Sequence, residues 1–238
     1  MKKMLVSDYD KTFYLNDEDI KENIKWVEEF RKQGNIFVFG TGRLYFDYKN
    51  KVLEYDLKYD YVLIDHGATI LDNKDNILSI CYIDNDIAGI IKNDLRLNDS
   101  INSFCCSEFK SRVYYDHKNL TKMQIAYYDS KIADYINKKI NEKYNDYVVS
   151  YKVNKDTIEI ISNKISKAKA IDILINKIGL ENDDVYTIGE GYSDIEMFEK
   201  YNGYCMTDSV DELKKVSNNE YNSVSDLISD IYKQNLKC

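Results

Sequence analysis

Short apolar runs that alternate with amphipathic helical stretches constrain this chain more than any other feature. The run at residues 36–39 contains no polar residue, which is typical of a parallel strand buried on both faces. A similar run begins at Met4, and between the two lies a helical pattern that includes Ile20 and Val27 and ends at Gly34. A strand, a helix and a strand with short links form a βαβ unit, so the chain predicts a parallel sheet flanked by helices.

The same alternation continues to residue 83 and resumes after residue 161. Apolar runs predict strands at 61–64, 185–188 and 203–206, and a hairpin over 68–83. Helical patterns cover about 44–56, 168–178, 209–216 and 223–235, with one more helix starting near 194.

The middle of the chain has a different order of elements. It predicts a helix at 84–98, strands at 109–115 and 122–128, a helix at 130–144, and strands at 147–153 and 157–161. This αββαββ order is that of an α+β unit built on antiparallel hairpins. We therefore expect an α/β fold: a Rossmann-like, doubly wound core formed by residues 1–83 and 162–238, with a second domain inserted at 84–161.

Unusual polar residues follow four of the predicted strands. Asp8 and Asp10 follow the first strand at i, i+2 spacing, so an extended backbone would point both carboxylates the same way. The other strand ends carry the sequences 41–43 (TGR), 66–67 (HG) and 190–194 (EGYSD). Ligands of open α/β sheets bind at the carboxyl ends of the strands. Carboxylates suit Mg²⁺, and a hydroxyl beside glycine and arginine suits phosphate, so these ends predict a shared site.

Four ordered motifs make the chain resemble a known family. Residues 8–12 have the pattern DxDxT, residues 41–43 read TGR, residues 166–167 read SK, and residues 189–197 read GEGYSDIEM. This set resembles the haloacid dehalogenase superfamily of phosphatases, specifically its Cof-type branch. That branch carries an α/β cap between the second and third motifs, where the inserted domain lies here.

The resemblance implies catalytic roles for three residues. Asp8 would be the nucleophile that forms an aspartyl-phosphate, a step that splits one difficult displacement into two easier ones. Asp10 would be the general acid for the leaving alcohol and then the base for water. Lys167 would neutralise charge between the nucleophile and the phosphate, and its spacing to the fourth motif favours it over Lys169.

The resemblance also implies a substrate site and a metal site. Thr41 and Gly42 would hold phosphoryl oxygens, and Arg43 is either a substrate contact or a structural ion-pair partner. The cofactor would be Mg²⁺, held by Asp8, Asp10 (through its carbonyl), Glu190 and Asp194.

Three positions depart from the family pattern, and one of them leaves the function open. Glu190 stands where aspartate is usual, and Mg²⁺ tolerates little distortion of its octahedron. Ser193 and His66 each replace an asparagine, and we interpret His66 as a hydrogen-bonded loop residue. The main prediction is a Mg²⁺-dependent phosphatase for a small phosphorylated metabolite such as a sugar phosphate. The alternatives are a weak or inactive phospholigand-binding regulatory protein and a phosphomutase-like phosphotransferase.

Composition bounds the partners and the location. A formal net charge of −8 argues against nucleic acid as a partner. No run approaches the ~18 apolar residues that span a membrane. The 5 cysteines have no metal-ligand spacing and suit reduced thiols, so we expect a cytoplasmic protein. The family resemblance implies that its partner is a small phosphorylated molecule.

Overall fold

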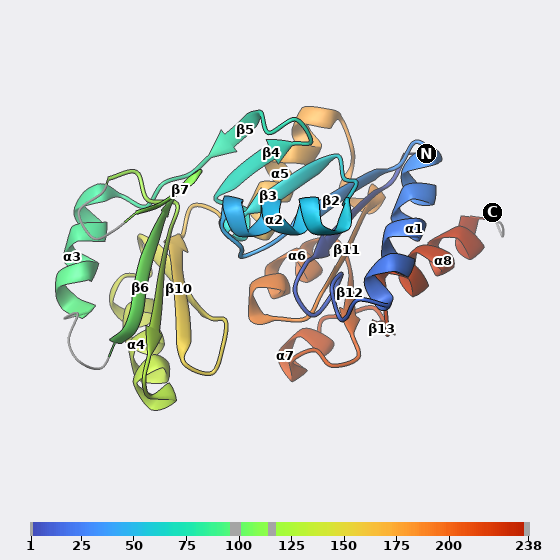
Figure 1. The fold of residues 1–238 in the computed structure, drawn as a ribbon. Helices are drawn as coiled ribbons and strands as arrows, with labels where there is room; N and C mark the ends of the chain where they lie inside the picture. Colours follow the sequence, from blue (N-terminus) through green and yellow to red (C-terminus); the bar gives the residue numbers. More distant parts are fainter. Residues whose placement is uncertain (1, 96–100, 114–117, 236–238) are drawn as a thin grey trace.

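The computed structural model describes residues 2–95, 101–113 and 118–235, which form two β-sheets with helices packed against them (Figure 1). The larger, central sheet has eight strands in the order β13-β12-β11-β1-β2-β3-β4-β5. The second sheet has five strands in the order β7-β6-β8-β10-β9. The predicted α/β class is confirmed.

The central sheet is parallel from β13 to β3, and a hairpin extends it antiparallel. Its parallel strands are β1 (Met4–Asp8), β2 (Ile36–Gly40), β3 (Tyr61–Ile64), β11 (Val185–Gly189), β12 (Asn202–Met206) and β13 (Glu220–Tyr221). The hairpin consists of β4 (Thr69–Asp72) and β5 (Ile77–Ile80). The sequence did not predict β13, because two residues are too few to show a period.

Helices cover both faces of the central sheet. One face carries α1 (Asp19–Lys32), α2 (Tyr45–Tyr55) and α8 (Val224–Asn235), and the other carries α5 (Lys167–Ile178), α6 (Ile195–Lys200) and α7 (Asp211–Lys214). Short 3₁₀ turns lie at η1 (Asp65–Gly67), η2 (Asn182–Asp184) and η3 (Tyr192–Asp194). Along β1, Leu5 packs into the first layer while Met4 and Val6 pack into the second. This alternation makes the core doubly wound, as predicted.

The second sheet has one apolar and one polar face. Its strands are β6 (Ile101–Glu108), β7 (Ser111–Val113), β8 (Lys122–Tyr127), β9 (Val148–Lys152) and β10 (Thr157–Ser162). Its apolar face packs on α3 (Asn85–Leu95) and α4 (Ser130–Lys143). Met123 on β8 and Ile158 on β10 belong to that layer, while Lys122, Gln124 and Glu159 alternate with them on the opposite face. That polar face is turned toward the central sheet, as the contacts below show.

One part of the predicted order in the second sheet is wrong. The sequence predicted one strand at 109–115, within which the short strand β7 lies, but it did not predict β6, which ends at Glu108 and pairs with β8. Phe109 has a φ of 42°, which turns the chain before the short strand β7. Residues 101–108 are rich in Ser, Asn and Cys, so they lack the apolar run that would have revealed a strand. Residues 96–98 of the predicted helix and residues 114–115 of the predicted strand lie outside the described residues.

Among the residues described, none of the helices is long and apolar enough to cross a membrane.

Candidate active site

The carboxyl ends of four strands meet at one edge of the central sheet. The register pairs Asp8 with Gly40 and Gly40 with Leu63, while Ser7 pairs with Ile188 on the other side. A cleft of about 920 Å³ opens at this edge. Both sheets line it; the central sheet and its loops contribute Asp8, Asp10, Gly42, Arg43, His66, Lys167 and Glu190, and the second sheet contributes Lys122, Gln124, Tyr151 and Glu159.

A buried lysine joins two of the predicted acidic residues. Lys167 Nζ donates to Asp8 Oδ1 at 2.7 Å and to Asp194 Oδ1 at 2.6 Å, and the Lys167 side chain is buried. Burial opposes the charge of Lys167, but the two carboxylates outweigh it and raise its pKa. Lys169 instead donates to the carbonyl of Asn163 at 2.7 Å. The structure therefore brings Lys167, and not Lys169, to Asp8.

Asp8 lies where its ionised form is disfavoured. Burial raises its pKa from 3.8 to about 7, and the negative charges of Asp194 and Asp10 act in the same direction. Lys167 acts in the opposite direction and only partly offsets them. A buried carboxyl group with a raised pKa in a cleft is typical of a functional site.

Asp194 is folded back against its own loop. Its Oδ2 accepts hydrogen bonds from the backbone N–H groups of Glu190 at 3.0 Å and Gly191 at 3.1 Å. A Cβ added at Gly189 would lie 2.4 Å from that same oxygen, so the close approach requires glycine. Both Asp194 oxygens thus have protein partners, and the residue fixes the loop and Lys167 together.

Asp10 points toward Arg43 in this structure. Arg43 donates from Nε to Asp10 Oδ2 at 2.8 Å and from Nη2 to Oδ1 at 2.6 Å, a bidentate ion pair. The hydrogen bonds with Asp10 raise the pKa of Arg43, although burial opposes the rise. The sequence left two roles open for Arg43, and in this structure Arg43 is the ion-pair partner of Asp10.

Thr41 and Gly42 lie in a tight turn directly after β2. The Thr41 side chain is buried, and its Oγ1 accepts a hydrogen bond from the Arg43 backbone N–H at 3.0 Å. The hydroxyl proton of Thr41 remains available to an anion in this position.

The carboxyl groups at this edge of the sheet suit a hard divalent cation that is held by few protein ligands. Asp8 and Glu190 line the same cleft, and the pKa of Asp8 is raised by burial and by the negative charges of Asp194 and Asp10, which a cation would offset. Within residues 2–95, 101–113 and 118–235, no group of three or more His, Cys, Asp or Glu side chains is close enough to hold a metal. The donors therefore fit the mode usual for Mg²⁺, in which one or two carboxylates bind alongside waters and substrate phosphate.

Glu190 contributes a further half-buried carboxyl group. Burial raises its pKa, and the charge of Asp194 adds to the rise, while Lys11 and Lys167 oppose it. Glu190 is thus another acid whose charge is not fully balanced at this edge of the sheet.

The sequence missed a buried ionic network where the two sheets meet. Lys122 Nζ donates to Glu159 Oε1 at 2.8 Å, and Glu159 Oε2 lies 2.5 Å from His66 Nε2. Gln124 donates to Glu159 Oε1 at 2.6 Å. On the central-sheet side, Asp65 Oδ2 accepts from Ser107 Oγ and Thr121 Oγ1, each at 2.7 Å. We call these seven side chains the inter-sheet network.

A signal for the network was present in the sequence but incomplete. Lys122 and Gln124 alternate with Met123 and Ile125, and Glu159 stands between two isoleucines, so alternation alone places them on one sheet face. Such a face is most often solvated. Only the position of the second sheet against the first shows that this face is buried.

Comparison with known proteins identifies the family. A model of the haloacid dehalogenase-like hydrolases matches residues 5–124 and 106–227 of the chain. The chain belongs to the haloacid dehalogenase-like hydrolases. An uncharacterized protein of Mycoplasma capricolum is 32% identical, over 84% of this chain and 88% of its own length. A protein of Buchnera aphidicola named "Putative phosphatase" is 24% identical, over 96% of this chain and 98% of its own length.

Solved structures of haloacid dehalogenase-like hydrolases share the fold. A Plasmodium vivax structure described as HAD/COF-like superposes with a TM-score of 0.86 at 15% identity, covering 98% of this chain and 96% of that one. A haloacid dehalogenase-like hydrolase from B. subtilis gives a TM-score of 0.84 at 16% identity, covering 95% and 99% of the two chains. The fold is therefore that of the Cof-type branch.

Proposed function

We propose that this hydrolase is a Mg²⁺-dependent phosphatase that acts on a small phosphorylated metabolite, such as a sugar phosphate, through an aspartyl-phosphate on Asp8. The observation that carries the proposal is the position of Asp8 in the cleft, with Lys167 bonded to it. The name of the Buchnera aphidicola relative supports the same activity.

In the proposed reaction, an Asp8 carboxylate oxygen forms a bond to phosphorus while the bond from phosphorus to the alcohol oxygen breaks. Asp10 donates its proton to the leaving alcohol and then accepts a proton from the water that hydrolyses the aspartyl-phosphate. Lys167 offsets the repulsion between the Asp8 carboxylate and the phosphoryl oxygens. Thr41 donates its hydroxyl proton to a phosphoryl oxygen.

Arg43 links substrate binding to the state of Asp10 in this proposal. The bidentate pair occupies both carboxylate oxygens of Asp10, and the proposed reaction needs that carboxyl group at the leaving alcohol. A phosphoryl group is a stronger partner for a guanidinium because it carries more charge. Arg43 therefore turns to the substrate phosphate, and the Asp10 carboxyl group is released to reach the leaving alcohol.

The proposed metal ligands are Asp8, the Asp10 carbonyl and Glu190, and Asp194 is the remaining acid of this site. A bound Mg²⁺ would polarise the phosphoryl oxygens and offset their charge. Direct ligation by Asp194 stays a prediction, and its bonds to Lys167 and to two amides support a role in holding the loop.

The second sheet and its helices form the proposed cap. We keep the boundaries at residues 1–83 and 162–238 for the core and 84–161 for the cap, since the cap's polar face lines the cleft. A cytoplasmic location stays a prediction from cysteine usage.

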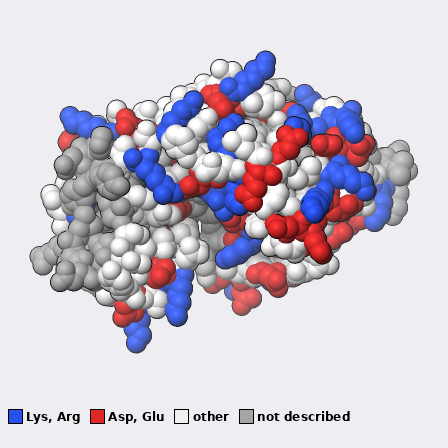
Figure 2. All heavy atoms as spheres, viewed as in Figure 1, with Lys and Arg blue, Asp and Glu red and all other residues white. Residues whose placement is uncertain are grey.

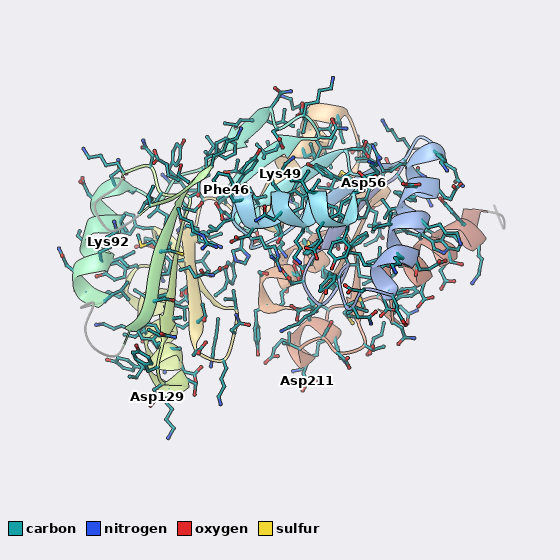
Figure 3. All side chains as sticks on the ribbon, in the orientation of Figure 1. Phe46, Lys49, Asp56, Lys92, Asp129 and Asp211 are labelled. Carbon is teal, nitrogen blue, oxygen red and sulfur yellow. The ribbon has the colours of Figure 1, made fainter. Side chains whose placement is uncertain are left out.

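The test is phosphate release from para-nitrophenyl phosphate with and without MgCl₂. We expect release that EDTA abolishes, and an Asp8→Asn protein whose kcat falls by about 10³-fold or more, because an amide is not a nucleophile. Asp56→Asn is the matched control, since Asp56 follows the C-terminal end of α2 (Figure 3) and is exposed. Full activity in the Asp8→Asn protein would refute the proposed nucleophile.

A second candidate is a phospholigand-binding regulatory protein with little turnover. Glu190 favours this candidate, because its side chain is longer than that of the usual aspartate and its carboxyl group is half-buried in the proposed metal site. Among the described residues, it is not part of a group of three or more metal-ligating side chains. This candidate predicts that inorganic phosphate raises the Tm while phosphate release stays at background. Glu190→Asp would then create activity, whereas a phosphatase would show activity before the substitution.

A further inference from the structure

The three backbone carbonyls of the turn at residues 41–43 each accept a hydrogen bond, and one donor comes from the second sheet. The Thr41 carbonyl accepts from the His66 backbone N–H at 2.9 Å, and the Arg43 carbonyl accepts from the Asp65 N–H at 3.2 Å. The carbonyl between them, on Gly42, accepts from Lys122 Nζ. The proposed phosphate-binding turn is therefore held on both sides by the central sheet and in the middle by β8.

Lys122 is buried and surrounded by groups that fix its ammonium. Its side chain is 1% exposed, its Nζ lies 2.8 Å from Glu159 Oε1, and Asp65 Oδ1 lies 3.7 Å away. Gln124 and His66 satisfy the remaining positions around the Glu159 carboxylate. Lys122 Nζ therefore donates to Glu159 on one side and to the Gly42 carbonyl on the other, with the Asp65 carboxyl group close by.

Gly42 shows how closely the network lies over the turn. A Cβ added there would stand 2.6 Å from His66 Cε1 and 3.1 Å from Glu159 Oε2. No side chain fits between the turn and the His66–Glu159 pair. The glycine of this motif is therefore required by contact with the inter-sheet network.

We propose that Lys122 is a positioning residue that sets the turn at 41–43, with Glu159 holding its ammonium in place. The inference rests on the proposed function, because it assigns the turn to phosphate binding. Buried ion pairs add little net stability compared with apolar packing, so a buried network of this kind serves best to fix one geometry. Since Lys122 lies on β8, the turn has its full set of hydrogen bonds only when the second sheet is in the place seen here.

The first test measures the turn itself and needs no turnover. Amide hydrogen exchange of residues 41–43 is compared between the natural protein and Lys122→Met. We expect exchange to be faster by about tenfold or more in the variant, because the middle of the turn loses its donor. Arg112→Met is the matched control: it also removes a cation of the second sheet that pairs with an acid of the core, Asp47, and it lies outside the turn.

The second test measures catalysis on para-nitrophenyl phosphate. We expect Lys122→Met to lower kcat by about ten- to a hundredfold and to weaken binding of inorganic phosphate, because a misplaced turn loses transition-state contacts. Arg112→Met should stay within about twofold on both readouts. Unchanged exchange and unchanged kcat in Lys122→Met would overturn the inference while leaving the phosphatase proposal intact.

A further variant serves as the test if Lys122→Met does not fold. If Lys122→Met is unfolded by circular dichroism, the double variant Lys122→Met/Glu159→Gln removes both charges of the Lys122–Glu159 pair and is measured in the same way. If residues 41–43 exchange faster in the variant while the natural protein hydrolyses no phosphate ester, the positioning role is upheld and the phosphatase proposal is rejected. Normal exchange in a folded double variant would reject the positioning role.

Discussion

Asp8 shows how one residue can be placed for chemistry at a cost to stability. Its carboxyl group is buried beside Asp194, and Lys167 only partly offsets the cost of its charge. The same arrangement that makes a carboxylate reactive toward phosphorus therefore makes the metal-free protein prefer a protonated Asp8.

This preference predicts that metal-free Asp8→Asn is more stable than the natural protein at high pH. The folded pKa of Asp8 is about 7, above the ordinary value of 3.8, so its stabilising protonation is complete below pH 3.8 and is lost as the pH rises through 7. An asparagine stays neutral throughout. Thermal unfolding from pH 4 to pH 8 should show an advantage for Asp8→Asn that grows to roughly 4 kcal/mol. An advantage that does not change with pH would contradict the shift.

Gly189 gives a second prediction for a single residue. Gly189→Ala would place a Cβ 2.4 Å from Asp194 Oδ2, so Asp194 must leave its two amides. We expect a loss of roughly 1–3 kcal/mol in the free energy of unfolding and a fall in activity. Gly191→Ala is the matched control, because nothing lies within 4 Å of a Cβ added there. Equal effects of the two variants in urea unfolding would show that Asp194 is not held by this contact.

Helix α5 is the element that delivers Lys167. Ser166 caps it by accepting the Lys169 backbone N–H on Oγ at 3.2 Å, and Gly179 ends it with a φ of 73°. Its first turn packs against Gly67, where a Cβ would lie 2.7 Å from the Ser166 carbonyl. The start of the helix is thus fixed from two directions, which places Lys167 beside Asp8.

Removing the cap should loosen this end of α5. Ser166→Ala is expected to cost about 1 kcal/mol, because one amide loses its acceptor. Ser166→Asp, which can still accept that hydrogen bond, should retain most of the stability. Chemical denaturation of the three proteins checks the order, and an alanine variant as stable as the natural protein would rule out the cap.

The elements also show where sequence patterns succeed. Strands β1, β2 and β3 were predicted because their apolar runs are unbroken and end at distinctive residues. Strand β6 was missed because serines and cysteines hide its period, and it becomes a strand through pairing with β8.

At the level of the whole molecule, the inter-sheet network connects the two sheets with charges. Figure 2 shows acidic and basic side chains intermixed over one face of the protein, but the charges of the network are buried beneath. Beside it, Arg112 on β7 pairs with Asp47 at 2.6 Å, near the end of α2 where Phe46 lies (Figure 3). Exposed pairs of this kind contribute little, so we expect the buried network to dominate the electrostatic contact.

The network predicts a pH-dependent contribution from Glu159. Burial acts to raise its pKa, but the charge of Lys122 and the hydrogen bond with His66 outweigh burial and hold the pKa at about 2, below the ordinary 4.5. Its contribution is therefore present above pH 4.5 and is lost as the pH falls through 2. Glu159→Gln should be less stable by about 3 kcal/mol at pH 7, with a difference that shrinks toward pH 2. Urea unfolding across this range checks it, and a constant difference would contradict the assignment.

The sequence by itself determined the α/β class and the four strand ends, because hydrophobic period and chain order are local properties, and the domain inserted at 84–161 stays a prediction. It also selected Asp8, Lys167 and Asp194, which the structure joins through one ammonium group. Only the tertiary structure decided that Arg43 pairs with Asp10 and that Lys122 reaches Gly42. These contacts span 33 and 80 positions of the chain. The first depends on the pairing of β1 with β2 and the second on how the second sheet packs against the central sheet, and no local pattern of residues encodes either.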